Sequence, residues 1–234
     1  VLQLATPAVV NVDGINYCRE TLHVIKPDLE PEPKTLLVHT LTGLVDYLTQ
    51  VGIEDGVKEF TVVVEDYNRV AAYGPLEPSF GRRKLFCAAA AIENQLRFGQ
   101  FLDQETFVID LQSKFKPDGD YVEVLKFSSN VKEVDERTSD DDGISQQVAA
   151  KIGIARVTDR KLPNPVTLHP YRTFPEIDPV GSLFVFRAQQ GPKFALIDAG
   201  GRKWHIDTIQ AIRAWLAGKL VSESNDGPIF RVIA

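Results

Sequence analysis

The sequence is poor in cysteine and has no long apolar run. Its 234 residues include only two cysteines, Cys18 and Cys87, which are far apart and have apolar or aromatic neighbours. This excludes a disulfide-rich scaffold, and we interpret both residues as reduced thiols in a cytoplasmic protein. No stretch approaches the roughly 18 apolar residues that span a bilayer, and residues 1–10 lack the basic start of a signal peptide. We therefore expect no membrane partner.

Basic residues are fewer than acidic ones. The chain has 26 Lys and Arg residues against 32 Asp and Glu residues, which gives a formal net charge of −6. An acidic protein has no overall attraction for a phosphate backbone, so non-specific binding to nucleic acid is disfavoured. Many of the acids are concentrated in residues 132–142, which leaves room for a local basic groove elsewhere.

Motifs for catalysis, cofactors and metals are missing as well. The sequence contains no GxxxxGK[ST] or GxGxxG phosphate loop, no CxxC or HExxH metal motif, and no GxSxG turn. We interpret the glycine pair in residues 199–204 as a turn and the aspartates at 140–142 as part of a solvated loop. The sequence thus predicts a non-enzymatic protein without a catalytic residue, a bound cofactor or a metal site.

The composition is that of a folded globular protein, with 44% apolar and 25% charged residues. Residues 1–12 resemble an arm, and the three prolines of residues 26–34 favour an extended linker because proline blocks helices and strand pairing. We therefore predict an N-terminal arm and proline-rich linker over residues 1–34, and a single domain over residues 35–234.

The hydrophobic pattern of that domain predicts both strands and helices. Alternating apolar residues indicate a strand after the turn at residues 13–17, and further strands and hairpins at 36–38, 60–74, 82–91, 183–198 and 229–233. The strand at 82–91 is expected to run into a short apolar helix. Residues 162–181 contain five prolines and are expected to be extended and to connect sheets.

Four helices are expected from apolar stripes that follow capping residues. These begin after Thr40, Asp103, Asp120 and Asp207. The helix after Asp103 is expected to include Phe115 and to end at Pro117, and the apolar stripe after Asp120 continues to Val131 and Val134. Because strands and helices do not alternate regularly, the fold class is predicted to be α+β, with antiparallel hairpins around a central helical pair and with a C-terminal helix.

A set of basic residues is the best candidate for ligand or nucleic-acid contact. Arginines beside exposed aromatic rings bind nucleotides through ion pairs and stacking. The candidates are Arg82, Arg83, Lys84, Arg172 and Arg187, with Arg97 and Tyr171 as further members of the same patch. No local pattern requires these side chains to converge, and the alternative is that they cover sheet edges with their aliphatic stems.

The proline-rich segment 162–181 also predicts contact with another copy of the chain. It carries Tyr171, Phe174 and Pro175 on a backbone that cannot complete regular strand pairing, so these residues are candidates for subunit contact. We predict that residues 1–12, 26–34 or 162–181 contact a second copy, which makes the protein a homo-oligomer.

Several segments together resemble a known family. DGINY at 13–17, LLVHTLTGLVDYLTQ at 36–50, FLDQETFVIDLQ at 101–112, YVEVLKFSSNVKEV at 121–134, LPNPVTLHPYRTFPEI at 162–177 and FVFRA at 184–188 follow the order of landmarks in the YfdQ-like family of uncharacterised phage and prophage proteins. The resemblance covers about residues 13–220 and rests on that order rather than on one sharp motif. It implies a phage gene, in a neighbourhood of early or recombination-related genes, and transfers no catalytic residue.

Three functions follow as hypotheses. The first is a non-enzymatic phage protein that acts by self-assembly, as a structural or shell-like homo-oligomer in the host cytoplasm. The second is an accessory of phage DNA metabolism or recombination that binds nucleic acid. The third is an anti-defence protein that sequesters a nucleotide, which requires a preformed basic pocket.

Overall fold

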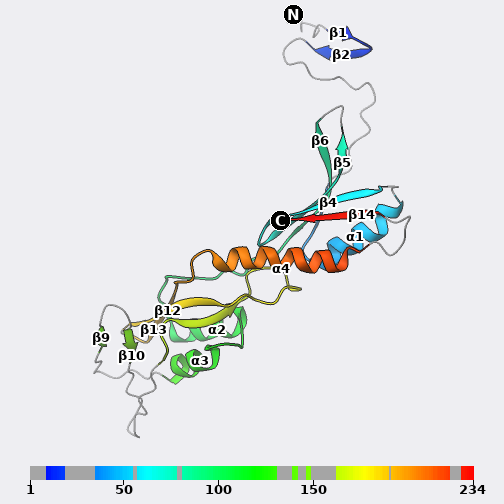
Figure 1. Ribbon diagram of the computed structural model, residues 1–234. Coiled ribbons are helices and arrows are strands. Elements are labelled where there is room, and N and C mark those ends of the chain that lie inside the picture. Colours follow the sequence, from blue (N-terminus) through cyan, green and yellow to red (C-terminus); the bar gives the residue numbers. More distant parts are fainter. Residues whose placement is uncertain are drawn as a thin grey trace, which may run out of the picture. The chain divides into compact units, whose positions relative to one another are not determined.

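A computed structural model describes residues 9–18, 35–54, 57–77, 81–130, 139–141, 146–148, 162–189, 191–221 and 228–234 (Figure 1). The chain divides into two compact units, Val1–Lys34 and Thr35–Ala234. The predicted linker at 26–34, the predicted strand beyond Cys18 and the helical positions Val131 and Val134 lie outside the described residues.

The first unit contains a hairpin of β1 (Val9–Val12) and β2 (Ile15–Cys18). Asp13 and Gly14 form its turn with φ values of 53° and 82°. Two consecutive positive φ values are typical of the two-residue turn that matches strand twist, and Asp-Gly is a favoured sequence for it. The turn at 13–17 is confirmed, and Val9–Val12, at the end of the predicted arm, pair with the strand that follows this turn.

The second unit begins with a five-stranded sheet, here called the first sheet. Its strand order is β14-β4-β5-β6-β3. The β4–β5 and β5–β6 pairs are antiparallel, whereas β14 is parallel to β4 and β3 is parallel to β6. The strands are β3 (Leu36–Val38), β4 (Glu59–Asp66), β5 (Arg69–Glu77), β6 (Arg82–Ala90) and β14 (Ile229–Ile233).

Helices α1 (Leu41–Glu54) and α4 (Lys203–Lys219) pack on one face of the first sheet (Figure 1). Alternate residues of β4, among them Phe60 and Val62, share a core with Leu44 of α1 and with Ile212 and Leu216 of α4. All five side chains are at most 1% exposed. The period of two in the strand and the i, i+4 spacing in α4 thus bring their apolar faces together.

A second sheet is antiparallel throughout, with the order β7-β13-β12-β11-β8. Its strands are β7 (Leu102–Asp103), β8 (Phe115–Lys116), β11 (Val166–Pro170), β12 (Ser182–Gln189) and β13 (Lys193–Asp198). Helices α2 (Gln104–Lys114) and α3 (Tyr121–Asn130) cover one of its faces (Figure 1).

Phenylalanines form the core of this second sheet. Phe186 on β12 lies 5.5 Å from the ring of Phe127 on α3, and Phe194 on β13 lies 5.4 Å from the ring of Phe107 on α2. Phe184 and Phe186 share the covered face because side chains alternate along a strand. This aromatic contact holds the two helices against the sheet.

Most of the expected elements are confirmed, including the hairpins and the strand at 36–38. Residues 162–181 were expected to be unable to complete regular strand pairing, and this is wrong for Val166–Pro170, because β11 pairs with β12 on one side and with β8 on the other. The α+β class is also confirmed. The predicted apolar helix after β6 is wrong, since residues 91–97 form no helix. The three alanines of β6 instead belong to a strand paired on both sides, by β5 and by β3, and this pairing outweighs the high helix propensity of alanine.

Three further boundaries differ from prediction. Asp103 caps α2 as expected, with Oδ1 accepting from Thr106 N at 2.9 Å, but the helix ends at Lys114 because Phe115 joins a strand. Asp207 is not a cap: α4 begins four residues earlier, and Asp207 pairs with Lys203 inside it. The acidic segment is not entirely a loop, since β9 (Ser139–Asp141) pairs with β10 (Gln146–Val148).

No helix in the described part of the chain is both long and apolar enough to cross a membrane.

Candidate functional site: Arg172 and two adjoining clefts

The segment that follows β11 is fixed to both sheets of the second unit. Tyr171 N donates to Lys114 O at 2.9 Å beside the second sheet, and Thr173 Oγ1 donates to Tyr67 O in the β4–β5 turn. Phe174, which is 1% exposed, belongs to the core of the first sheet. Arg172 is therefore held at the junction of the two sheets by its neighbours on either side.

The Arg172 side chain is surrounded by aromatic rings and is only 8% exposed. Its guanidinium carbon lies 4.3 Å from the ring centre of Trp204, 5.0 Å from that of Phe98 and 5.4 Å from that of Phe184. Trp204 belongs to the first turn of α4, and Phe184 to β12. These rings fix the planar cation in one place, since a guanidinium is attracted to an aromatic face.

The polar partners of Arg172 are few and distant. Nη1 donates to Ser182 Oγ at 3.3 Å, Nη2 lies 3.5 Å from Asp198 Oδ2, and the buried Nε has no partner. Burial lowers the pKa of Arg172 to about 10, against the opposing effects of Asp198 and Tyr67, so the side chain stays charged at neutral pH. A guanidinium has five N–H donors, so most of the binding capacity of this one is unused.

The larger of two clefts beside Arg172 has a volume of about 540 Å³. Three of its lining residues are basic, namely His39, Lys116 and Arg172, and Asp178 is the one acidic residue among them. The other lining residues are Thr40, Ile92, Asn94, Tyr171, Thr173, Phe174, Pro175, Ile177 and Pro179. Within an acidic protein, this cleft has a local excess of positive charge.

Two observations describe how the larger cleft is built. His39 Nδ1–H donates to Ala90 O at 2.9 Å, and Lys116 Nζ lies 3.3 Å from Asp178 Oδ1. Ile92 is 75% exposed and Tyr171 is 39% exposed, so the cleft also offers apolar surface. Basic groups and exposed apolar groups in one cleft suit an anion that carries a flat organic part.

The smaller cleft has a volume of about 230 Å³ and shares Arg172 and Asn94 with the larger one. Its remaining lining residues are the aromatic Tyr67, Phe98 and Trp204, the acidic Glu93 and Asp198, and Leu96. Burial raises the pKa of Tyr67, and the charges of Glu93 and Asp66 add to the effect. The two clefts therefore differ in character, since one has an excess of basic groups and the other combines rings with carboxylates.

The β4–β5 turn makes several contacts beside the smaller cleft. The Tyr67 ring lies 5.1 Å from the Trp204 ring and 4.9 Å from the His205 ring. His205 Nε2 lies 2.6 Å from Asp66 Oδ1, and Asn68 Nδ2 donates to Glu93 Oε1 at 2.6 Å. The β4–β5 turn is thus held to the start of α4 and to residues 91–101, here called the crossing segment, which connect β6 of the first sheet with β7 of the second.

The predicted basic residues do not come together. Arg82 pairs with Glu77 at 3.6 Å, Arg83 donates to Gly74 O at 3.1 Å, and Lys84 lies over the Phe86 ring, so all three stay on the β5–β6 hairpin. Of the five candidates for ligand or nucleic-acid contact, Arg172 alone lines either cleft.

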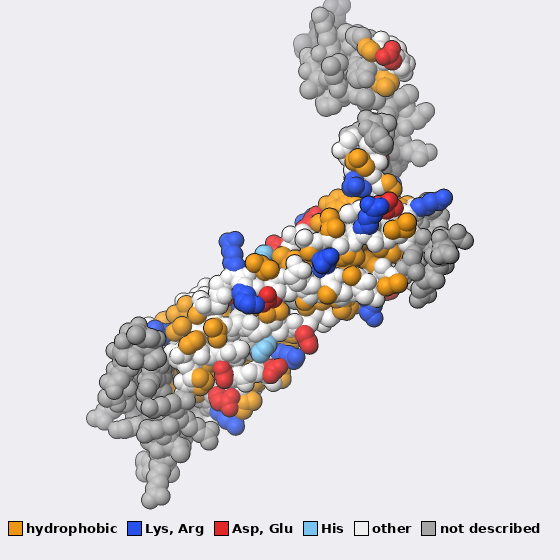
Figure 2. Space-filling model, in the orientation of Figure 1, with side chains coloured by type: hydrophobic (Ala, Val, Ile, Leu, Met, Phe, Trp, Pro, Cys, Tyr) orange, Lys and Arg blue, Asp and Glu red, His pale blue; other side chains and the backbone are white. Residues whose placement is uncertain are grey.

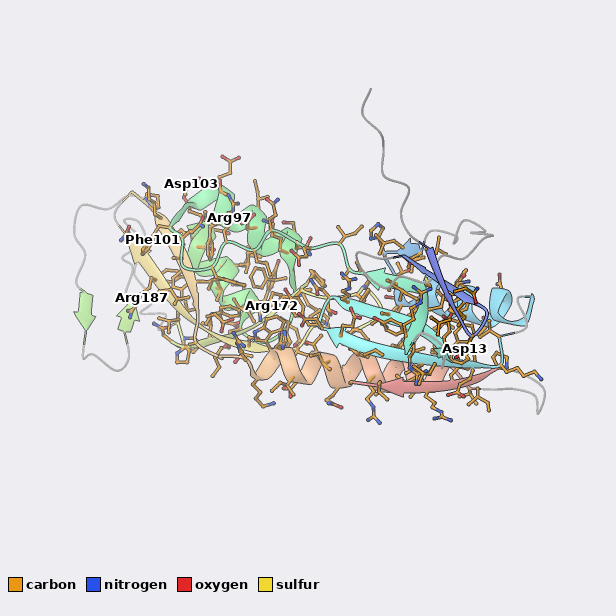
Figure 3. The ribbon with its side chains drawn as sticks, turned by 90° about the horizontal axis from the view of Figure 1, so that it is seen from above. Asp13, Arg97, Phe101, Asp103, Arg172 and Arg187 are labelled. Atoms are coloured by element: carbon orange, nitrogen blue, oxygen red, sulfur yellow. The ribbon has the colours of Figure 1, made fainter. Side chains whose placement is uncertain are left out.

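The other basic side chains are also spread over the second unit. Figure 3 shows Arg187, on β12, at a different place along the unit from Arg172. Figure 2 shows Lys and Arg side chains spread along the visible face rather than gathered in one patch. Arg97 pairs with Asp110 on α2 at 2.7 Å.

The three candidates for subunit contact have different surroundings. Tyr171 and Pro175 are exposed, whereas Phe174 is buried in the core of its own chain. Tyr171 and Pro175 both line the larger cleft, so that cleft and any contact made by segment 162–181 would share surface. Of the segments predicted to contact a second copy, residues 1–8 and 26–34 lie outside the described part of the chain.

Sequence reasoning missed most of the site. His39, Asn94, Lys116 and Trp204 were not singled out as ligand contacts, although all of them line the clefts. The one local signal was the sequence Tyr171-Arg172 beside prolines, since an arginine next to an aromatic residue in an extended segment is free to stack. The companions of Arg172 come from distant segments that no sequence period connects.

Among the described residues, no three His, Cys, Asp or Glu side chains are placed to hold a metal ion. Cys87 lies in the core of the first sheet, and burial raises the pKa of its thiol to about 11, so the thiolate is scarce at neutral pH. The arrangement at Arg172 is suited to holding an anion in place.

Comparison with known proteins gives no further guide to the site. No family model matches the chain, and neither a curated protein nor a solved structure is similar to it.

Proposed function

We propose that the protein is a non-catalytic binding protein whose ligand is an organic anion of the nucleotide type, held in the larger cleft. The observation that carries this proposal is Arg172, a charged and buried side chain that three rings hold in place while its donors have only two distant partners. A phosphate or carboxylate group would supply the missing acceptors, and charge-assisted hydrogen bonds of this kind are among the strongest in proteins.

The other basic groups of the cleft support the same ligand. Lys116 lines the cleft with Arg172 and His39, and it adds to the positive charge of the cleft. Because Arg172 is already desolvated and ordered, little of its side-chain entropy remains to be lost on binding. The exposed Ile92 and Tyr171 would contact the uncharged part of the ligand.

A titration of the full chain with a nucleoside monophosphate and with inorganic pyrophosphate, followed by calorimetry, tests this function. We expect saturable binding that weakens at high salt and weakens further in Lys116→Gln. Lys126→Gln is the matched control, because Lys126 is an exposed lysine on α3 that lines neither cleft. Absence of binding at low salt for both probes would contradict the proposal.

The cellular setting is proposed from the resemblance to the YfdQ-like phage proteins. We propose that the protein acts in the cytoplasm of an infected cell, where removing a signalling nucleotide would counter a host defence. Binding of nucleic acid has less support, because the basic side chains do not gather on the face in Figure 2 and the net charge is −6.

Self-assembly is a second candidate function, supported by the two edge strands of the first sheet. Leu37 on β3 is 57% exposed, and Ile229 and Ile233 on β14 are 56% and 49% exposed. No described strand pairs with the outer edge of either strand. Open apolar edges are templates for pairing with another chain. Light scattering tests this: we expect an oligomer whose mass falls in Ile233→Lys, and a monomeric wild type would contradict it.

A further inference from the structure

The geometry points to guanine as the base of the bound nucleotide, with the base in the smaller cleft and the phosphate in the larger one. This inference rests on the proposed function. The two clefts have Arg172 and Asn94 in common as lining residues, and their volumes are about 230 Å³ and 540 Å³. A ligand that fills both must have a flat group at one end and an anionic group at the other, as a nucleoside monophosphate does.

The walls of the smaller cleft suit a flat ring. Tyr67, Phe98 and Trp204 all line it, and they come from the β4–β5 turn, the crossing segment and α4. The Tyr67 and Trp204 rings meet at 68°, so they form two sides of a corner rather than one continuous wall. A planar base placed there would contact aromatic carbon on more than one side, which is how proteins hold single bases.

The carboxylates of the smaller cleft determine which base fits. Asp198 is engaged by Gly200 N at 2.9 Å through one oxygen and faces Arg172 through the other. Glu93 accepts one hydrogen bond, from Asn68, and its carboxylate has several lone pairs left. Glu93 is therefore the available acceptor, and it requires a base edge that consists of donors.

Guanine meets this requirement best. Its ring N1–H and its 2-amino group are adjacent donors, and they match the two oxygens of a carboxylate. Adenine presents its amino group beside an unprotonated ring nitrogen, which would face the carboxylate with a second acceptor. Uracil presents one N–H between two carbonyl oxygens and so suffers the same mismatch twice. Such a base is disfavoured because an acceptor that faces another acceptor makes no hydrogen bond and is repelled.

The phosphate end is placed by Arg172. Arg172 lines both clefts, so its Nη groups would donate to a phosphate in the larger cleft while the base occupies the smaller one. Lys116 and His39 lie along the larger cleft and would contact any further phosphate groups. The Arg172 contact is common to all nucleotides, whereas the Glu93 contact is specific to the base.

Calorimetric titration of the full chain with GMP, AMP, UMP and inorganic pyrophosphate tests the inference. We expect GMP to bind most tightly. In Glu93→Gln we expect the affinity for GMP to fall by about tenfold or more, as for the loss of a charge-assisted hydrogen bond. The affinity for pyrophosphate should not fall, because the substitution removes a negative charge near Arg172. Glu93 is exposed, so this variant should fold, and Glu123→Gln, at an exposed glutamate on α3, is the matched control.

The outcomes separate the two proposals. If the three nucleotides bind equally and Glu93→Gln has no effect on GMP, the base assignment is wrong while the anion site stands. If neither the nucleotides nor pyrophosphate bind, the proposed function fails together with the inference.

Discussion

Replacement of Phe174 by alanine tests whether segment 171–177 belongs to the core of its own chain. The Phe174 side chain is 1% exposed and packs in the core of the first sheet. Truncation of a buried phenylalanine removes its transfer free energy and leaves a cavity, at a cost of about 3–5 kcal/mol. At about 2–4 °C per kcal/mol for a chain of this size, the expected fall in Tm is about 6–20 °C.

Tyr171→Ala is the matched control in the same segment. Tyr171 is 39% exposed, so we expect its truncation to lower the free energy of unfolding by less than about 1 kcal/mol. Thermal unfolding followed by circular dichroism measures both variants, and light scattering measures their mass. If Phe174→Ala unfolds within about 1 kcal/mol of wild type and has a smaller oligomer mass, Phe174 packs against a second copy and the placement in the core is wrong.

Three further outcomes follow from local geometry. Gly119→Ala should destabilise the protein by about 1–3 kcal/mol in urea unfolding, because Gly119 has φ +60° and a Cβ there would lie 2.6 Å from Thr167 O. Gly99→Ala should lower the free energy of unfolding by less, because Gly99 has φ +74° but no atom lies within 4 Å of the added Cβ. Equal losses in the two variants would show that the contact with Thr167 O is irrelevant. In a Cys18→Ser background at about pH 8, the Cys87 thiol of the folded protein should react with a disulfide reagent about 100-fold more slowly than the thiol of the protein unfolded in urea. Burial raises the pKa of this thiol to about 11, which keeps it protonated until the pH is well above the ordinary range of a thiol. Similar reaction rates in the folded and the urea-unfolded protein would contradict the burial. Arg172→Met should change the free energy of unfolding by less than about 1 kcal/mol, because removal of a buried charge with few partners offsets the lost cation–π contacts. The same variant should abolish binding of pyrophosphate, with unchanged binding as the contrary result.

Hairpins and helix starts could be predicted from the sequence because they depend on residues that are close together in the chain. The β4–β5 and β12–β13 hairpins follow from alternating apolar residues around short turns, and Asp103 was identified as a cap from its place before an apolar stripe. The failures arose where long-range pairing decided the outcome. The alanine run of β6 continues as a strand because it has neighbours on both sides, and α2 ends at Lys114 because Phe115 pairs with β11.

The site was much harder to predict than the fold. Arg172 was a candidate because an aromatic residue precedes it, but its partners were sought among other arginines. The structure instead surrounds it with Phe98, Phe184 and Trp204, which lie on three separate segments. Such a cluster depends on how the two sheets meet, and a single sequence carries no period or spacing that records this.

The most direct test of the anion site at Arg172 is the fluorescence of Trp204 during a titration with GMP. The sequence has two tryptophans, so Trp215→Phe leaves Trp204 as the one reporter, and its ring centre lies 4.3 Å from the Arg172 guanidinium. The account predicts a saturable change in emission that is lost when Arg172→Met is added. A titration with no saturable change, or one that is the same with and without Arg172, would contradict it.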